Sequence, residues 1–344
     1  MSTPSKTPAS SADPPRVAFA MPVYNGSAYL CQALDALQAQ TETRWIAMVT
    51  DNASTDATSE IANEYAKADP RIRYFRNETN LGANGNFNRS MERALETGAP
   101  FVKWAAHDDC PHPEFLSACL DALEDRPEAI GAHTAFRLVD EDGQSFRFDA
   151  NAGGFLTPDG GGADVWTWSP DAWDALGDPA PNRRLRRFLR DKTGQSLVYG
   201  IFRSQDVAAT RPFAMPGAED AWCAEMLLRG ALLSVPRTLF DQRLHAGSAR
   251  HMSRREYIEY ETGAPPKSEL LPSIGRAVDY AGAIVRAPLT PTETVRAFIA
   301  LASFAIGLGR LRNLLVPGPN NYLGLNFSRG SRPKADSSGP MRAT

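Results

Sequence analysis

"FVKWAAHDDC", residues 101–110, is an apolar stretch with a single lysine that stops at one histidine and two aspartates. A short apolar run of this kind is typical of a strand buried inside a sheet, and we expect the strand to cover residues 101–109. In parallel sheets, ligands bind beyond the carboxyl ends of the strands. The stretch therefore predicts both a buried strand and a polar site where that strand ends.

The residues before this stretch repeat the same pattern, because apolar strand patterns alternate there with helical ones. Strands are expected at 16–25, 45–52 and 71–77, and helices at 27–40, 55–68, 84–98 and 112–125. Strict alternation of apolar strands with helices predicts an α/β fold whose parallel sheet is covered on both faces.

Polar residues follow three of the predicted strands, as "VYNG", "TDNAST" and "HDD". Because carboxyl ends of parallel strands meet at one edge of a sheet, we expect these side chains to converge on one crevice. The acidic and amide members are Asp51, Asn52, Asp56, Asp108 and Asp109. Turn and helix-cap roles are the simpler interpretation of such residues. For Asp108 and Asp109 we favour a divalent cation that takes its remaining ligands from substrate phosphates.

The second half of the chain is less regular. Asp142 and Gly143 suggest a hairpin turn, and residues 148–195 hold a Gly-, Pro- and Trp-rich stretch that we interpret as an acceptor loop or lid. Further elements are expected at 196–204, 219–230 and 237–245, and Thr290 to Glu293 resembles a capping box that opens a helix running to about Leu315. The predicted division is a disordered tail (1–15), one α/β domain (16–250), a helical C-terminal extension (251–316) and a second disordered tail (317–344).

The composition of the chain indicates which kinds of binding partner and which cellular compartment to expect. The chain of 344 residues has 37 basic and 40 acidic residues, so its net charge of −3 argues against a nucleic-acid partner. Four cysteines without C-x-x-C spacing argue against a zinc site or a disulfide framework and favour a reducing, cytoplasmic location. The N-terminus has no apolar signal region, and the apolar run 297–309 is short for a bilayer crossing.

A basic run, "NRRLRRFLR" (182–190), has two interpretations. The favoured one is a solvated helix face, and the other is contact with phosphate or anionic lipid. Together with the apolar C-terminal helices, it motivates the hypothesis of peripheral association with the inner face of the cell membrane. Homo-oligomer formation stays open.

Four segments in this order resemble the inverting nucleotide-sugar glycosyltransferases of family 2, which have a GT-A fold. They are "AFAMPVYNGSAYLCQALDALQAQT", "TDNASTDAT", "RIRYFRNETNLG" and "KWAAHDDCPHPEFL". The resemblance implies a Rossmann-related, mixed but mainly parallel sheet flanked by helices, here with a helical C-terminal extension. It implies metal-assisted transfer of a sugar, with inversion, from a nucleoside-diphosphate sugar to a carbohydrate or lipid-linked hydroxyl acceptor, in assembly of a cell-surface polysaccharide or glycan.

The resemblance also implies roles for single residues. The donor nucleotide would be held by Pro22, Tyr24, Asn25, Asp51, Asn52, Asn80 and Gly82. Mg²⁺ or Mn²⁺ would be bound by Asp108, with Asp109 as a helper, and Ala106 stands where the family motif has its first aspartate. The diphosphate would be contacted by His245, Arg243 and Arg250.

The general base of an inverting transfer would come from the acidic pair at the start of a later helix. Asp220 is the preferred base from the motif. Glu219 is the alternative, because the spacing to Gly230 is one residue shorter than the common pattern.

Two other functions stay open. A nucleotidyltransferase shares the topology, but such enzymes usually have a glycine-rich, basic loop after the first strand, whereas "PVYNGSAYL" has no Lys or Arg. A catalytically inactive sugar-nucleotide-binding module would keep the donor turns and tolerate loss of the base. Neither G-x-G-x-x-G after the first strand nor a P-loop motif is present.

Overall fold

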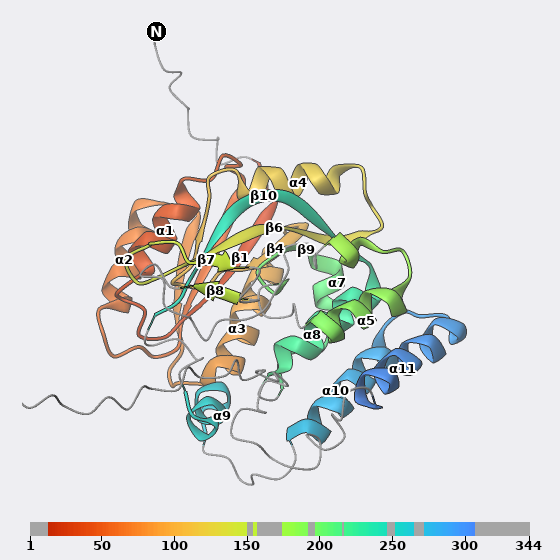
Figure 1. Ribbon diagram of the computed structural model, residues 1–344. Coiled ribbons are helices and arrows are strands. Elements are labelled where there is room, and N and C mark those ends of the chain that lie inside the picture. The colour runs from red at the N-terminus through yellow and green to blue at the C-terminus, as the bar shows by residue number, and fades with distance from the viewer. Residues whose placement is uncertain are drawn as a thin grey trace, which may run out of the picture.

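The computed structural model describes residues 13–149, 154–156, 174–191, 197–214, 217–245, 252–264 and 272–306 (Figure 1). The strands are β1 (Val17–Val23), β2 (Trp45–Asp51), β3 (Ile72–Arg76), β4 (Phe101–Trp104), β5 (Cys110–Pro111), β6 (Ala129–Val139), β7 (Arg147–Asp149), β8 (Gly154–Leu156), β9 (Ile201–Arg203) and β10 (Ala231–Arg243). The helices are α1 (Leu30–Gln38), α2 (Thr58–Ala68), α3 (Gly82–Glu96), α4 (Phe115–Glu124), α5 (Pro181–Asp191), α7 (Ser204–Ala208), α8 (Ala218–Arg229), α9 (Arg254–Thr262), α10 (Pro272–Arg286) and α11 (Pro291–Ile306), with a 3-10 turn, η2 (Asp174–Gly177).

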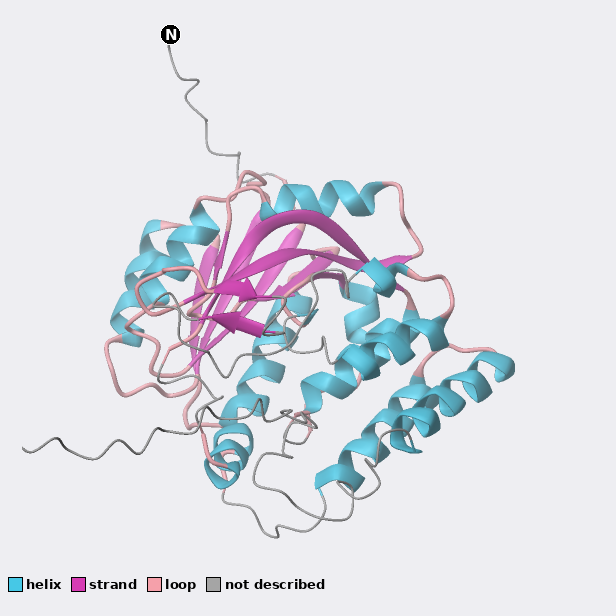
Figure 2. Ribbon diagram, viewed as in Figure 1, coloured by secondary structure: helices cyan, strands magenta, loops and turns pink. Residues whose placement is uncertain are grey.

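A central sheet organises the molecule (Figure 2). It has eight strands in the order β3-β2-β1-β4-β9-β6-β10-β5. The pairs β1–β2, β1–β4, β2–β3 and β6–β10 are parallel, and β9 and β5 pair with their neighbours in antiparallel fashion. A small second sheet joins β7 to β8. The predicted α/β fold with a mixed, mainly parallel sheet flanked by helices is confirmed.

Helices cover both faces of this sheet because its strands are apolar on both sides. Along β1, Val17, Phe19 and Met21 enter one core while Ala18 and Ala20 enter the other, as the alternation of side chains along a strand requires. Helices α1, α2 and α4 close the first core, and α3, α5, α8, α10 and α11 close the second. The sheet is therefore a buried platform, and its polar residues gather where strands end.

The strand predicted for residues 101–109 is shorter than expected. It ends at Trp104, after which the Ala105 amide makes one further bond to the Ala20 carbonyl, 2.9 Å away, and the chain then leaves the sheet. On the side away from β1, β9 pairs with only Phe101 and Val102 of β4, so the later residues have a partner strand on one side alone. Ala106 to Asp109 are consequently free to line a pocket.

Strands in the second half also differ from the prediction. Only residues 201–203 of the expected strand 196–204 pair with the sheet. In contrast, β10 begins at Ala231, before the expected residue 237, and its ladder is irregular between Val235 and Thr238. Pro236 lies in this irregular step, where its missing N–H costs no ladder hydrogen bond. The predicted hairpin turn is present, with Gly143 at φ +82° and a bridge between Val139 and Ser145.

The C-terminal helices pack onto α5 and α8. Glu225 of α8, almost fully buried, receives two hydrogen bonds from Arg286 of α10 at 2.7 and 2.9 Å. The predicted capping box is confirmed, because the Thr290 amide donates to the Glu293 carboxylate at 2.9 Å and the Glu293 amide donates to the Thr290 hydroxyl at 3.3 Å. The expected end of this helix, near Leu315, lies outside the described residues.

None of the helices in the described part of the chain has the length and apolar character that a bilayer crossing needs. The two predicted tails fall mostly outside the described residues, and so does about half of the predicted loop 148–195. The described part of that stretch differs from the prediction, because it holds β8, η2 and the helix α5. The proposed domain division stays a prediction.

Helix α9 is seated on the N-terminus of α3 through two glycines. Gly82 has φ +72° and Gly263 has φ +69°, a conformation that glycine adopts without strain. A Cβ atom on Gly82 would lie 2.4 Å from the Gly263 nitrogen, and one on Gly263 would lie 3.0 Å from the Gly82 nitrogen. The two backbones therefore touch, and this contact, which we call the glycine seat, fixes α9 beside the strand ends.

We predict that Gly82→Ala destabilises the protein more than Gly98→Ala does. Gly98 has nearly the same φ, +73°, but a Cβ there meets nothing within 4 Å. The Gly98 variant should lose only the left-handed backbone cost of about 1–2 kcal/mol. The Gly82 variant should lose about 1–3 kcal/mol more of the free energy of unfolding through the steric clash. The backbone amides of α9 should also exchange their hydrogens faster in this variant.

Urea unfolding gives the two free energies, and hydrogen exchange reports on α9. Equal losses of unfolding free energy in the two variants, with unchanged exchange in α9, would show that the glycine seat is not a tight contact.

Candidate functional site

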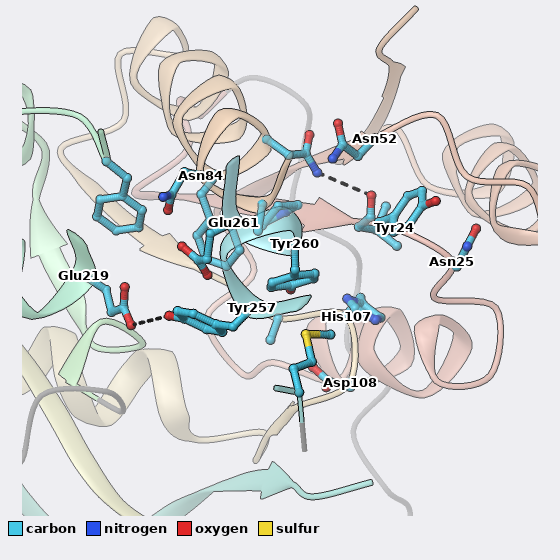
Figure 3. A pocket seen from close by; sticks show the side chains of 18 of the residues that line it. Tyr24, Asn25, Asn52, Asn84, His107, Asp108, Glu219, Tyr257, Tyr260 and Glu261 are labelled. Atoms are coloured by element: carbon cyan, nitrogen blue, oxygen red, sulfur yellow. Dashed lines mark hydrogen bonds between the residues drawn. The ribbon is translucent and has the colours of Figure 1, made fainter. Parts of the chain in front are cut away.

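A cavity of about 780 Å³ opens at the carboxyl ends of the parallel strands (Figure 3). The predicted site residues that line it are Pro22, Tyr24, Asn25, Asn52, Asn80, Asp108, Asp109, Glu219, Arg243 and His245. Asp51, Gly82 and Asp220 are not among its described lining residues, and Arg250 lies outside the described part of the chain. The predicted convergence of three strand ends on one crevice is thus present, but Asp51 and Asp56, two of its five predicted acidic and amide members, do not line it.

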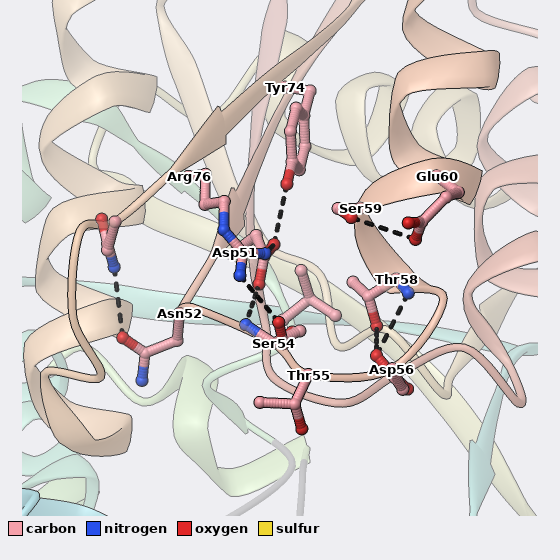
Figure 4. A network of polar contacts seen from close by, with 12 residues as sticks. Asp51, Asn52, Ser54, Thr55, Asp56, Thr58, Ser59, Glu60, Tyr74 and Arg76 are labelled. Carbon is pink, nitrogen blue, oxygen red and sulfur yellow. Dashed lines mark hydrogen bonds and ion pairs between the residues drawn. The ribbon is translucent and has the colours of Figure 1, made fainter.

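Asp51 is fully buried beneath the crevice (Figure 4). Residues of β3 and of the turn after β2 hydrogen-bond its carboxylate. Its Oδ2 accepts hydrogen bonds from the Tyr74 hydroxyl, at 2.7 Å, and from the Arg76 guanidinium, while Oδ1 accepts from the Ser54 amide at 2.8 Å. Tyr74 and Arg76 precede the "NLG" segment, so the sequence places them near this turn without showing which way they point. Asp51 holds the turn after β2 together.

Asn52 lines the cavity, but its amide is fully engaged within the protein. Its Nδ2 donates to Asn80 Oδ1 at 2.8 Å and to the Gly82 carbonyl at 3.2 Å. Its Oδ1 accepts from the Leu81 amide at 2.9 Å and from Asn77 Nδ2 at 3.2 Å. Two donors and two lone pairs are all that a side-chain amide offers, so Asn52 shapes the segment 80–82 and has no hydrogen bond left for a nucleobase.

The turn after β1 carries an exposed aromatic ring over a rigid backbone. Asn25 adopts φ +48°, its amide donates to Ser54 Oγ at 2.9 Å, and its Oδ1 accepts from the Thr55 amide at 2.8 Å. Tyr24 beside it keeps 40% of its surface exposed. Asp56 does not reach the cavity lining and instead braces this turn. Burial would raise its pKa, but hydrogen bonds from Ser27 and Thr58 lower the pKa of Asp56 to about 2.

Asp108 and His245 meet across the cavity floor. His245 Nε2 lies 3.0 Å from Asp108 Oδ2. Burial works to raise the pKa of Asp108, but His107 and His245 outweigh it and hold that pKa below its ordinary value. An ionised carboxylate beside an imidazole is therefore available to a cation.

Asp109 and Arg243 support this floor from beneath. Asp109, only 4% exposed, accepts the Arg243 amide at 2.9 Å. The Arg243 guanidinium donates to the carbonyls of Asp140 and Glu141, at 3.0 and 2.8 Å, and to Gln32 Oε1 at 2.7 Å. Arg243 thus ties β10 to the loop before Ser145, and most of its donors are occupied.

Lys103, the single lysine of the opening stretch, is completely buried below this floor. Its ammonium donates to the carbonyls of Trp104, at 3.2 Å, and Tyr199, and it lies 4.8 Å from the ring centres of Phe115 and Phe240. Burial lowers its pKa to about 7, opposed by the charge of Asp109. A lysine inside an apolar strand is the sequence signal for such a buried ammonium group.

Glu219 and residues of α9 form the opposite wall. The Tyr257 hydroxyl lies 3.5 Å from Glu219 Oε1, and Tyr260 and Glu261 of α9 also line the cavity (Figure 3). Sequence reasoning missed all three α9 residues, because nothing in their spacing marks a site. Glu219 faces the cavity and Asp220 does not because consecutive residues of a helix point about 100° apart.

The described side chains supply part of a cation site. No group of three or more His, Cys, Asp or Glu residues within the described ranges is arranged to hold a metal ion. One carboxylate oxygen from Asp108 and one imidazole nitrogen from His245 do fit two positions of a cation whose other ligands come from substrate phosphates. The residues present fit the implied metal on that basis.

We predict that Asn52→Asp destabilises the protein by about 2–3 kcal/mol, because a carboxylate removes both donors and faces the oxygens of Asn80 and Gly82. The control is Asn63→Asp on the exposed surface of α2, which should change the free energy of unfolding by less than about 0.5 kcal/mol. Denaturant unfolding measures both. An Asn52 variant as stable as its control would show that the amide network contributes no stability.

Known proteins are similar mainly to the first half of the chain, which carries the strand ends described above. Residues 18–154 match the model of "Glycosyl transferase family 2". The "Putative teichuronic acid biosynthesis glycosyltransferase TuaG" of Bacillus subtilis is 27% identical over 194 residues, which are 56% of this chain and 70% of that protein. An uncharacterized protein of Mycobacterium tuberculosis, Rv1520, is 34% identical over 122 residues, which cover 35% of each chain.

Solved structures share the fold. TarS 1–349 of S. aureus in complex with UDP has a TM-score of 0.55 at 17% identity, covering 87% of this chain and 74% of that one. The mannosyltransferase PcManGT of Pyrobaculum calidifontis, solved with GDP-Man and Mn²⁺, has a TM-score of 0.51 at 16% identity, covering 86% and 71%. Residues 18–154, which carry the first strands of the sheet and part of the strand-end cavity, are thus similar to glycosyl transferase family 2.

Proposed function

We propose that this protein transfers a sugar from a nucleoside-diphosphate sugar to a hydroxyl group of a carbohydrate or lipid-linked acceptor, with inversion. One observation carries the proposal. A single cavity has the Asp108–His245 pair on its floor, the exposed Tyr24 at the strand ends and Glu219 on the facing wall. A donor with its diphosphate at the floor would then have its anomeric carbon toward the wall that holds a carboxylate.

Each part of the cavity has a task in such a transfer. Tyr24 offers a ring face to a nucleobase, and the turn beneath it is fixed by Asn25, Ser54 and Thr55. Asp108 and His245 would hold Mg²⁺ or Mn²⁺, which when bound supplies positive charge to the leaving diphosphate. Lys103 lies below the same floor, where its charge offsets that of Asp109.

Glu219 is the residue we assign as general base, in place of Asp220, because only Glu219 reaches the cavity. It takes the proton of the acceptor hydroxyl as that oxygen forms a bond to the anomeric carbon. The bond from this carbon to the phosphate oxygen breaks on the opposite side, and the nucleoside diphosphate leaves with the electron pair. A single displacement of this kind inverts the anomeric centre, and its catalysis rests on positioning and electrostatics.

The names of relatives suggest the acceptor class. One relative is named for teichuronic acid biosynthesis, so we propose that this chain acts in assembly of a cell-surface glycan. The neighbouring structures contain UDP, UDP-GlcNAc or GDP-Man, so both uridine and guanosine donors should be screened. The suggestion that the enzyme works at the inner face of the membrane would be tested by flotation with anionic liposomes at low salt, and absence of binding would remove it.

We predict that Glu219→Gln lowers kcat/KM for sugar transfer by about 10²–10⁴-fold, the usual contribution of a general base. Asp220→Asn is the matched comparison on the adjacent residue, and we expect it to cost less than about tenfold, because Asp220 lies in the first turn of α8 and does not line the cavity. Donor binding by Glu219→Gln, measured by thermal shift, should stay as in the wild type.

A large loss in Asp220→Asn with full activity in Glu219→Gln would restore Asp220 as the base. Full activity in both variants would contradict base catalysis by this acidic pair.

We also predict that Mn²⁺ raises the melting temperature of the wild type in the presence of a nucleoside diphosphate and does not do so in Asp108→Asn, because a ligand that binds only the folded state stabilises it by mass action. Asp121→Asn on the exposed face of α4 is the control and should respond to Mn²⁺ like the wild type. An equal response of the Asp108 variant would place the metal elsewhere.

A further inference from the structure

Glu261 is a buried carboxyl group of α9 that none of the roles above uses. It lines the cavity with only 8% of its surface exposed, two residues before the glycine seat (Figure 3). Tyr257 from its own helix and Asn84 from α3 hydrogen-bond its carboxyl group. Burial of a carboxylate is costly unless cations or several donors offset the charge, so this position is unusual for an acid.

The groups that act on Glu261 come from three elements. Glu219 approaches from α8, Tyr257 belongs to α9, and Asn84 is the contribution of α3. Tyr260 of α9 is also near, since burial and then the charge of Glu261 raise the pKa of Tyr260. None of these groups is a cation. Burial, followed by the negative charge of Glu219, raises the pKa of Glu261 well above its ordinary value, although Tyr257 and Asn84 oppose the rise.

The hydrogen atom of the Tyr257 hydroxyl decides how these groups fit together. A tyrosine hydroxyl has one hydrogen to donate, and an ionised carboxylate only accepts. Tyr257 lies between Glu261 and Glu219 and contacts both. If both carboxyl groups were ionised, one of them would lose this donor. A protonated Glu261 instead donates to the Tyr257 oxygen, and the Tyr257 hydrogen is then free to point at Glu219.

We propose that Glu261 is a positioning residue that acts as a neutral acid: it donates a hydrogen bond to Tyr257, which in turn donates to Glu219 and aims the base at the acceptor hydroxyl. Asn84 hydrogen-bonds the Glu261 carboxyl group from α3, and the glycine seat keeps α9 beside α3. This inference rests on the proposed function, because it assigns Glu219 the role of base.

The test compares pH profiles of sugar transfer. Glutamine imitates a protonated glutamate, because its amide has a donor group and an acceptor oxygen and cannot ionise, although it carries two N–H hydrogens in place of one O–H. Glu261→Gln should therefore keep kcat/KM near neutral pH within about threefold of the wild type, since its bond to Tyr257 persists. The wild type should lose activity as pH rises through the raised pKa of Glu261, and the variant should lack this loss.

Tyr257→Phe tests the middle of the relay. It removes the hydroxyl that links the two acids, and we expect kcat to fall about tenfold, as for loss of a hydrogen bond to a charged group, with KM for the donor unchanged. Glu64→Gln, on the exposed surface of α2, removes one acidic charge far from these contacts and should keep the wild-type profile.

Thermal unfolding gives a readout that does not depend on activity. A carboxyl group whose pKa is raised by folding stabilises the protein fully below its unfolded pKa, and this contribution is lost as pH rises toward the folded pKa. The melting temperature of Glu261→Gln should therefore rise relative to that of the wild type as pH rises from 5 to 8. A constant difference would overturn the neutral state of Glu261, whatever the transfer assay shows.

Failure of the inference and failure of the proposed function look different. If the wild type transfers sugar and Glu219→Gln does not, yet Glu261→Gln keeps the alkaline loss or is inactive at neutral pH, only the inference is wrong. If the wild type transfers no sugar from any donor, the proposed function is wrong, and the unfolding comparison still decides whether Glu261 is neutral.

Discussion

Parallel pairing of β1 with both β2 and β4 is the constraint on which the site depends. The register sets Val23 beside Asp51 and Ala20 beside Trp104, so these strands deliver their polar tails to one edge. Apolar side chains on both faces leave no other place for the carboxylates of this segment. The location of the crevice is thus a result of strand direction and burial, before any single residue acts on a ligand.

Below that edge, buried polar groups keep the crevice in shape. Asp51, Asn52 and Lys103 are each almost inaccessible to solvent, and each has several hydrogen-bond partners from different elements. A buried polar group with all its partners fixes one arrangement, because any other arrangement leaves a donor or acceptor unpaired. These buried polar groups cost free energy to remove from water, and the hydrogen bonds that offset this cost also hold the floor of the cavity in one arrangement.

Much of the fold could be predicted from periodicity, and the site only in part. The alternation up to residue 125 placed the strands and helices, and the polar tails located the crevice. Periodicity could not show that Tyr74 and Arg76 hydrogen-bond Asp51 below the crevice, because this contact depends on the direction of side chains in the next strand. Whether Glu219 or Asp220 faces the cavity depends on a rotation of one residue along α8, and this rotation is set by where α8 begins after Gly217. A capping box, Ser253 with Glu256, marks the start of helix α9, but the place of α9 on α3 depends on contacts between backbones.

The four asparagines that join the ends of β2 and β3 to α3 give the two halves of the cavity floor different chemical sensitivities. Asn52, Asn77, Asn80 and Asn86 are linked by amide hydrogen bonds, and none of them carries a charge. Ionic strength and proton concentration leave such bonds unchanged, whereas they alter the attraction between a carboxylate and an imidazole. The amide bonds at the asparagine end of the cavity thus do not depend on charge, whereas the contact between Asp108 and His245 at the other end does.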